Sequence, residues 1–309
     1  MRNKSKMPKQ LGRRNKIIIT LFLGFLIVYC IILAIRSIQA SAFFDKQNRI
    51  NILFYSDQPV LLSFGLTDDV NYIVSFTHED RVDVPGGYDR YAVGALGRLS
   101  DVENDRYILQ RAFSSMTSAY IDYFVAPKKN KVYDESDFRE PQYKKLVLIR
   151  SLFSPQKHTN ANIFDKIYLL WLIIRKREGD FVVLKSATIH DEISDQTFFS
   201  EQGFQKKYKG FFYHQALREE GRELQILYRN YNSAYVLSRV IEGQGIRVVD
   251  LSQYDDQVKE RCVIKHNIDK KSKTILFLQR RFQCEVKKAN IEGSDIIFLL
   301  GNGLEKEWE

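Results

Sequence analysis

The stretch IIITLFLGFLIVYCIILAI, from Ile17 to Ile35, decides how the rest of the chain is organised. It contains nineteen residues and no charged side chain. At a rise of about 1.5 Å per residue, a helix of this length approaches the roughly 30 Å hydrocarbon core of a bilayer. We therefore expect a single transmembrane helix over residues 17–36.

Positive charge is concentrated directly before this stretch. Seven Lys or Arg and no acid precede it, namely Arg2, Lys4, Lys6, Lys9, Arg13, Arg14 and Lys16. Because such flanks stay in the cytoplasm, we expect residues 1–16 to be a cytoplasmic basic tail. Everything after residue 36 would then be extracytoplasmic, anchored in the cytoplasmic (inner) membrane. The alternative is a cleaved signal peptide with Ala40-Ser41-Ala42 at the cleavage site, although the apolar stretch exceeds the usual length of about 7–15 residues.

The net charge of +9 also belongs mainly to this N-terminal segment. Residues 1–36 hold eight Lys or Arg and no Asp or Glu, so subtracting 8 from 9 leaves +1 for residues 37–309. A nucleic-acid-binding domain carries its positive charge on the folded part. We therefore expect no nucleic-acid partner.

Strand and helix patterns alternate through the middle of the chain. Short apolar runs predict strands at 51–55, 60–64, 71–76 and 121–125, and longer patterns predict helices at 143–153 and 163–177. In the second helix one stripe is apolar, and we expect it to face the core: Ile163, Ile167, Leu170, Trp171 and Ile174. These elements predict an α/β domain over residues 37–219.

The last ninety residues have clearer boundaries. The segment 223–228 predicts a strand, 234–242 a helix and 246–251 a second strand, parallel to the first because a helix connects them. Further strands are expected at 262–264 and 295–300, with a helix at 272–282 between them. Residues 220–309 therefore form a small α/β C-terminal domain in this prediction.

Two cysteines lie outside the apolar N-terminal stretch. Cys262 and Cys284 are an even pair, and the exported location favours a disulfide between them. The alternative is two independent buried thiols. The acid-rich triplets at 78–80 and 190–192 are contiguous, so their side chains cannot all turn toward one metal ion.

The C-terminal segment resembles the LytR C-terminal domain. Leu224 to Leu227 is similar to its first strand, Val236 to Val240 to its helix, and Gly245 to Val249 to its Gly-Phe-x-Val strand. Asp295 to Gly301 resembles its usual end. The turn departs from the family pattern, because Tyr228-Arg229-Asn230-Tyr231 stands where Asn-Gly-Thr-Gly is expected.

The middle of the chain resembles a reduced LytR-CpsA-Psr domain. Ser56 to Leu62 is similar to the Ser-Asp-Thr strand of that family, and Ser75 to Gly86 to its Ser-Ile-Pro-Arg-Asp-Thr stretch. Ile121 to Val125 resembles its Ile-Asp-x-Tyr-Val strand. The resemblance implies a domain that lies outside the cell and is anchored to the membrane. In active members it also implies transfer of a glycopolymer from a polyprenyl pyrophosphate to peptidoglycan.

This chain departs from the family at the residues that carry the chemistry. His78 stands at the position of a pyrophosphate-clamping arginine and Glu79 at the neighbouring aspartate, whereas Asp57 remains as an acid on the metal side. A neutral imidazole does not replace the bidentate, permanently charged guanidinium. A pocket without a convergent arginine pair is therefore expected.

These observations predict a membrane-anchored extracytoplasmic cell-envelope protein, a non-catalytic binding or scaffolding relative of the family. Its partners would be the membrane and a cell-wall glycopolymer, a lipid-linked precursor or an envelope protein, and no cofactor is expected. The alternative is a phosphotransferase that moves a polyprenyl-pyrophosphate-linked glycopolymer to the wall. In that alternative the candidate catalytic residues are Asp57, His78, Arg81 and Arg90, and Asp57 would help to hold a divalent metal. The phosphate clamp would be rebuilt from residues such as Arg81, Arg90 or Arg98.

Overall fold

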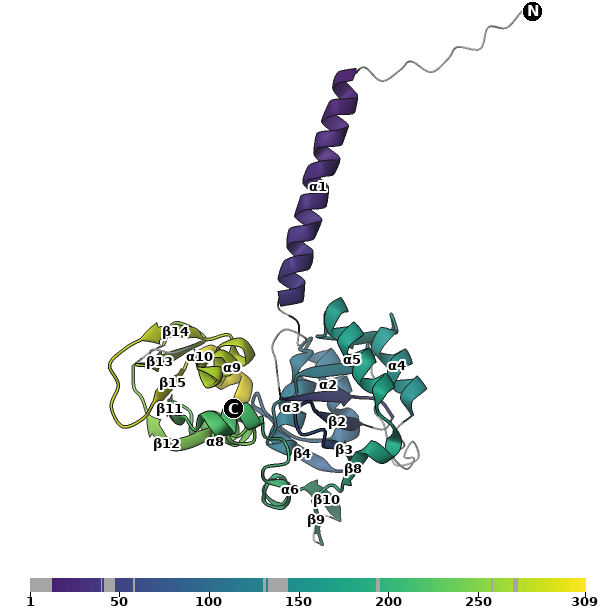
Figure 1. Cartoon of the computed structure of the whole chain (residues 1–309). Coiled ribbons are helices and arrows are strands. Elements are labelled where there is room, and N and C mark those ends of the chain that lie inside the picture. The colour runs from purple at the N-terminus through teal and green to yellow at the C-terminus, as the bar shows by residue number, and fades with distance from the viewer. Residues whose placement is uncertain are drawn as a thin grey trace, which may run out of the picture.

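The computed structural model describes residues 13–39, 41, 48–57, 59–129, 132, 144–192, 195–256, 258–268 and 272–309. It contains three β-sheets with helices packed against them, so the mixed α/β class predicted from the sequence is confirmed. Figure 1 shows the third sheet to one side of the first, with helix α1 extending away from both. Most of the expected basic tail, residues 1–12, lies outside the described residues.

The first sheet is built around strands that are buried along their whole length. Its strand order is β7-β6-β1-β2-β3-β8. In that order the strands span Lys157–Thr159, Tyr123–Pro127, Arg49–Phe54, Val60–Gly65, Asn71–Ser75 and Phe181–Leu184. Strand β1 pairs antiparallel with β2 and parallel with β6. Because successive side chains on a strand alternate between faces, Leu53 enters one core cluster and Ile52 enters another.

Helices cover both faces of this sheet. Helices α2 (Leu96–Val102) and α3 (Tyr107–Thr117) contribute side chains to the cluster that contains Leu53. Helices α4 (Lys145–Phe153) and α5 (Ile163–Arg175) contribute to the cluster that contains Ile52. The sheet is therefore the middle layer of three.

The face by which α5 packs differs from the sequence prediction. The buried face carries Leu169, Leu172 and Ile173, whereas the predicted core residues Ile163, Ile167, Trp171 and Ile174 are between 48% and 57% exposed. That part of the prediction is wrong because α5 is apolar around much of its circumference, so periodicity alone does not choose the packed face. Asp165, which is buried and accepts a hydrogen bond from the Tyr123 hydroxyl at 3.0 Å, turns its own side of the helix toward the sheet.

A second, four-stranded sheet has the strand order β5-β4-β10-β9. In that order the strands span Tyr88–Ala92, Arg81–Val84, Gln196–Phe199 and Thr188–Asp191. Helices α6 (Glu201–Tyr208) and α7 (Gln215–Glu220) follow it and lead to the third sheet.

The third sheet has the strand order β12-β11-β15-β13-β14. In that order the strands span Arg247–Gln253, Glu223–Tyr228, Ile296–Leu300, Cys262–His266 and Glu285–Lys288. Its helices are α8 (Tyr231–Glu242), α9 (Lys273–Phe282) and α10 (Asn302–Trp308). Strands β11 and β12 are parallel, as the sequence predicted for two strands joined by a helix. Strand β14 and helix α10 were not predicted.

Cys262 and Cys284 form a disulfide, with a sulfur–sulfur distance of 2.03 Å and a Cα–Cα distance of 4.7 Å. The bond joins the two cysteines that the sequence analysis paired. It connects the first residue of β13 to the second residue after α9, and so links a strand to the end of a helix that packs on the same sheet.

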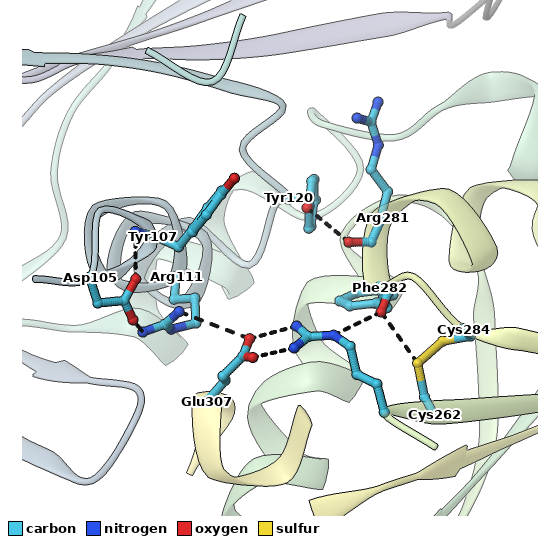
Figure 2. Close-up of polar contacts among 10 residues, drawn as sticks. Asp105, Tyr107, Arg111, Tyr120, Cys262, Arg281, Phe282, Cys284 and Glu307 are labelled. Atoms are coloured by element: carbon cyan, nitrogen blue, oxygen red, sulfur yellow. Dashed lines mark hydrogen bonds and ion pairs between the residues drawn. A yellow bond between two sulfur atoms is a disulfide. The ribbon is translucent and has the colours of Figure 1, made fainter. Parts of the chain in front are cut away.

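Ion pairs connect this part of the molecule to the first sheet. Figure 2 shows Glu307 between two arginines: it pairs bidentately with Arg261, and its Oε2 lies 4.0 Å from Nη1 of Arg111 on α3. Arg281 at the end of α9 pairs at 2.6 Å with Asp122, which is buried and directly precedes β6. The Asp122 carboxylate also accepts a hydrogen bond from the backbone N–H of Asn51 at 2.7 Å. The packing of the two parts therefore includes buried charge as well as apolar contact.

Helix α1 spans Arg13–Gln39 and contains the apolar stretch with which the sequence analysis began. Among the residues that the structure describes, none forms a helix that is both long enough and apolar enough to cross a membrane. The transmembrane helix at residues 17–36 therefore stays a prediction.

Candidate functional site

Strands β1, β3, β6 and β8 of the first sheet all end at the same edge. Strand β6 runs parallel to β1, and β3 runs in the same direction because both β1 and β3 pair antiparallel with β2. The carboxyl ends of parallel strands are a common place for ligand sites in open α/β sheets. Asp57 follows β1, His78 follows β3 and Lys128 follows β6 at this edge.

His78 is buried and connects two of these strand ends. Its ring Nε2 contacts the backbone carbonyl of Asp57. Its own carbonyl accepts a hydrogen bond from Gly94 N–H at 2.9 Å. His78 thus helps to hold the loop after β1 against the end of β3, which is a structural use of the imidazole.

Asp57 itself is exposed and lies near a cation. Burial lowers the pKa of the Lys157 ammonium, and the charge of Asp57 partly offsets this effect. Within the described residues, no three His, Cys, Asp or Glu side chains are grouped as metal ligands. The metal role considered for Asp57 therefore stays a prediction.

Arg81 and Arg90 lie on the second sheet, in β4 and β5. Arg90 donates from Nε to Asp83 at 2.7 Å, and its guanidinium lies 5.1 Å from the centre of the Phe198 ring. The pair with Asp83 raises the pKa of Arg90. The structure thus brings Asp57 and His78 together and leaves Arg90 engaged elsewhere.

Asp80, two residues after His78, is a buried carboxyl group. Burial raises its pKa to about 6, a backbone hydrogen bond at Thr77 opposes the shift, and the negative charge of Glu79 adds to it. Among the described residues its Oδ2 has no hydrogen-bond partner. Asp80 therefore titrates closer to neutral pH than an ordinary aspartate.

A cavity of about 480 Å³ opens at the same carboxyl edge, between α2, the start of α3, β6 and β7. It is lined by Arg98, Ser100, Asp101, Asn104, Arg106, Leu109, Phe124, Ala126, Pro127, Lys128, Lys129 and His158. None of Asp57, His78, Arg81 and Arg90 belongs to this lining. We call it the cationic cavity.

Four side chains of the cationic cavity carry a permanent positive charge: Arg98, Arg106, Lys128 and Lys129. Asp101 is the acid among the lining residues. Burial lowers the pKa of His158, the charges of Arg106 and Lys128 lower it further, and Asp101 opposes them. Since its ordinary pKa of about 6.5 is already below 7, this imidazole is neutral at that pH, and the cavity remains positive because of the arginines and lysines.

The floor of the cationic cavity is apolar. Leu109, Phe124 and Ala126 are each at most 3% exposed. A ligand with a phosphate or carboxylate group and an adjoining apolar part matches this combination, because guanidinium groups bind such anions bidentately. Arg98 and Arg106 both line this cavity, and the expectation of a pocket without a convergent arginine pair stays a prediction.

Sequence reasoning did not single out Arg106, Lys128, Lys129 or His158. The sequence could have marked Lys128 and Lys129 as site candidates, because they follow a buried strand almost directly. His158 and Arg106 have no such signal, because β7 and the loop before α3 come next to β6 only through tertiary packing.

Comparison with known proteins gives only distant likenesses. No family model matches the chain, and no curated protein matches it. Among solved structures, Bacillus subtilis TagV is 10% identical over 52% of this chain and 94% of its own, with a TM-score of 0.36. Bacillus subtilis TagT is 15% identical over 53% of this chain and 89% of its own (TM-score 0.37), and Lin1025 from Listeria innocua is 12% identical over 53% and 97% (TM-score 0.34). Likeness at this level says nothing about activity.

Proposed function

We propose that this protein is a membrane-anchored, extracytoplasmic cell-envelope protein that binds a phosphate-bearing ligand in the cationic cavity without transferring it. The observation that supports the proposal most directly is the gathering of Arg98, Arg106, Lys128 and Lys129 around one cavity. Phosphate groups keep their negative charge at neutral pH, so a site for them needs fixed positive charge or a metal. Suitable ligands are a cell-wall glycopolymer with phosphate groups or a lipid-linked precursor.

Binding without transfer is supported by the positions of the residues considered for catalysis. His78 is buried and contacts the Asp57 carbonyl, and Arg90 is paired with Asp83. Asp57 is near Lys157 and outside the cavity lining. A transfer reaction needs groups placed around the reacting phosphorus atom, and these residues do not line the site where the phosphate would bind.

The extracytoplasmic location is supported by the sequence before the folded part. The uncharged run Ile17 to Ile35 follows seven cationic residues and lies within a continuous helix. The Cys262–Cys284 disulfide suits an oxidising compartment. An alkaline phosphatase fused after Glu309 should be active in intact cells, whereas a cytoplasmic reporter that is active at the same position would contradict the location.

Ligand binding is tested with the full chain in detergent, by calorimetric titration of inorganic pyrophosphate. We expect Arg98→Gln and Lys128→Gln each to weaken binding by about tenfold or more, because hydrogen bonds to charged groups contribute about 1.5–3 kcal/mol. Lys206→Gln, an exposed lysine on α6 outside the cavity lining, is the matched control and should bind as the unchanged chain does. Equal affinity in all four proteins would contradict the cationic cavity as the binding site.

The second candidate is the phosphotransferase reaction, and it is favoured by one observation, the two arginines in a single cavity. The test supplies a polyprenyl-pyrophosphate-linked glycan, a peptidoglycan acceptor and Mg²⁺ to the unmodified chain. Our proposal expects no product. Metal-dependent product formation that Asp57→Ala abolishes would replace the binding proposal with the enzyme.

A further inference from the structure

An apolar surface remains exposed where the start of α4 and the end of α5 meet. Leu146 is 70% exposed, Val147 54%, Trp171 48% and Ile174 53%. Lys145 on α4 donates from Nζ to the Ile174 carbonyl at 2.8 Å, so the start of α4 and the end of α5 lie side by side. We call these four apolar residues, together with the exposed cations Lys144, Arg175 and Arg177, the α4–α5 patch.

The α4–α5 patch lies at the edge of the first sheet opposite the cationic cavity. Next to Ile174 and Arg175, Lys176 forms an ion pair with Asp69 in the loop between β2 and β3. The adjoining Asp68 pairs at 2.9 Å with Arg49, the first residue of β1. The patch is therefore close to the point where the chain enters the folded part. Figure 1 shows α4 and α5 together on the flank of the first sheet that faces away from the third sheet.

The length of chain between α1 and β1 limits how far this edge can be from a membrane. Helix α1 ends at Gln39 and β1 begins at Arg49. Ten residue steps span at most about 35 Å when fully extended. If α1 is anchored, Arg49 at the patch edge of the sheet thus lies at most about 35 Å from the end of the anchor, and the cavity edge lies farther along the strands.

The charges around the patch are mainly positive. Lys144, Arg175 and Arg177 are exposed, and the Arg175 guanidinium lies 4.4 Å from the centre of the Trp171 ring. Among the described residues the nearby exposed acids are Glu178, Asp180, Asp68 and Asp69, of which Asp68 is paired with Arg49 and Asp69 with Lys176. Exposed aliphatic residues, a tryptophan and several cations together are typical of surfaces that bind the interface of anionic membranes.

We infer that the α4–α5 patch binds the anionic outer surface of the membrane and thereby orients the folded part, an inference that depends on the proposed anchor. Trp171 and Ile174 enter the interfacial region, and Lys144, Arg175 and Arg177 contact lipid phosphates. Bound in this way, the sheet directs its opposite edge away from the bilayer. The cationic cavity then faces the cell wall, and of the two proposed ligands this orientation favours the cell-wall glycopolymer over the precursor whose lipid stays in the bilayer.

The chain contains two tryptophans, Trp171 and the buried Trp308, which allows a direct test. In Trp308→Phe, Trp171 is the remaining tryptophan, and it is excited selectively over the tyrosines. The full chain with this change is reconstituted into vesicles of phosphatidylglycerol and brominated phosphatidylcholine. We expect Trp171 emission to shift to shorter wavelength and to be quenched by the brominated chains.

Charge variants in the same background measure the electrostatic part. Lys144→Gln with Arg177→Gln should weaken docking about fivefold per cation, which corresponds to about 1 kcal/mol for each basic residue near an anionic surface. Lys206→Gln with Lys306→Gln removes two exposed cations elsewhere and should leave the quenching unchanged.

Three outcomes would overturn the inference. If the protein floats with the vesicles but Trp171 emission is not quenched, the result supports the anchor and contradicts membrane binding by the patch. A blue shift without quenching by brominated lipid assigns the patch to a protein contact, either a second copy or another partner. A protein that does not float with the vesicles overturns the anchor and the patch together, whereas the pyrophosphate titration in detergent tests the cavity independently of both.

Discussion

Helices α5 and α9 both carry several large apolar residues, but they bury different shares of them. On α9, Ile275, Leu278 and Phe282 are at most 7% exposed and pack on the third sheet. On α5, Trp171 and Ile174 remain about half exposed. The difference shows that apolar residues on a helix do not by themselves tell which of them the fold buries.

The largest expected effect concerns Arg281 at the end of α9. Arg281→Met removes the cation that pairs with buried Asp122, and we expect the free energy of unfolding to fall by about 3–5 kcal/mol because a buried charge is left uncompensated. Urea denaturation at pH 7 measures the change. Lys273→Met, an exposed cation at the start of the same helix, is the control, and an equal loss there would contradict the role given to the ion pair.

Truncating one apolar residue on each helix compares the two faces directly. Leu278→Ala on α9 removes a side chain that is 0% exposed, and should cost about 2–5 kcal/mol of unfolding free energy. Ile167→Ala on α5, where the side chain is 53% exposed, should change it by no more than about 0.5 kcal/mol. Both are measured on detergent-solubilised chain. A large loss for Ile167→Ala would mean that the outer face of α5 is covered within the protein.

The disulfide next to α9 gives a third difference, because α5 has no such link. Replacing both Cys262 and Cys284 with Ser opens a loop with a sequence separation of 22, and the chain-entropy relation gives a loss of about 3 kcal/mol. Comparing the unfolding free energy of the unmodified chain with and without a reductant measures the same loss. Unchanged stability in both experiments would show that the bond adds little to the packing of β13 and α9.

The smallest effect is a pH dependence in the central part of the chain. Asp80 is buried, as Asp122 is, and burial raises its pKa to about 6. Its unfolded pKa is about 3.9, so the folded state binds the proton more tightly and stability falls as pH rises from about 4 to about 6. Asp80→Asn should lose this decline and be the more stable protein above pH 6. The melting temperatures of both proteins are measured from pH 4 to 8. If they change with pH in the same way, the assignment to Asp80 is contradicted.

Much of the fold was predictable from local sequence. The strand at Glu223–Tyr228 has its predicted bounds, and the helix and parallel strand that follow it lie where the pattern placed them. Helix α5 begins at the predicted residue. These elements follow from period-2 and period-3.6 patterns and from turn residues, which act over a few neighbouring positions.

The candidate site was much less predictable. His78 and Asp57 come together as neighbours at one sheet edge, but the cationic cavity beside them is lined by other residues. Arg98, Lys128 and His158 are far apart in the sequence and meet because β6 lies between α3 and β7. No local pattern contains that juxtaposition.

The sequence alone determined the order of most elements, the parallel β11–β12 unit and the concentration of charge before the apolar stretch, since each depends on composition or short-range periodicity. It favoured a bond between Cys262 and Cys284 beside the alternative of two free thiols, and the structure has the bond. Only the tertiary structure decided which face of α5 is buried, which cations share a cavity and which acids are left in the interior. The physical reason is that solvation and charge pairing depend on distances between residues that are remote along the chain, and these distances exist only after folding.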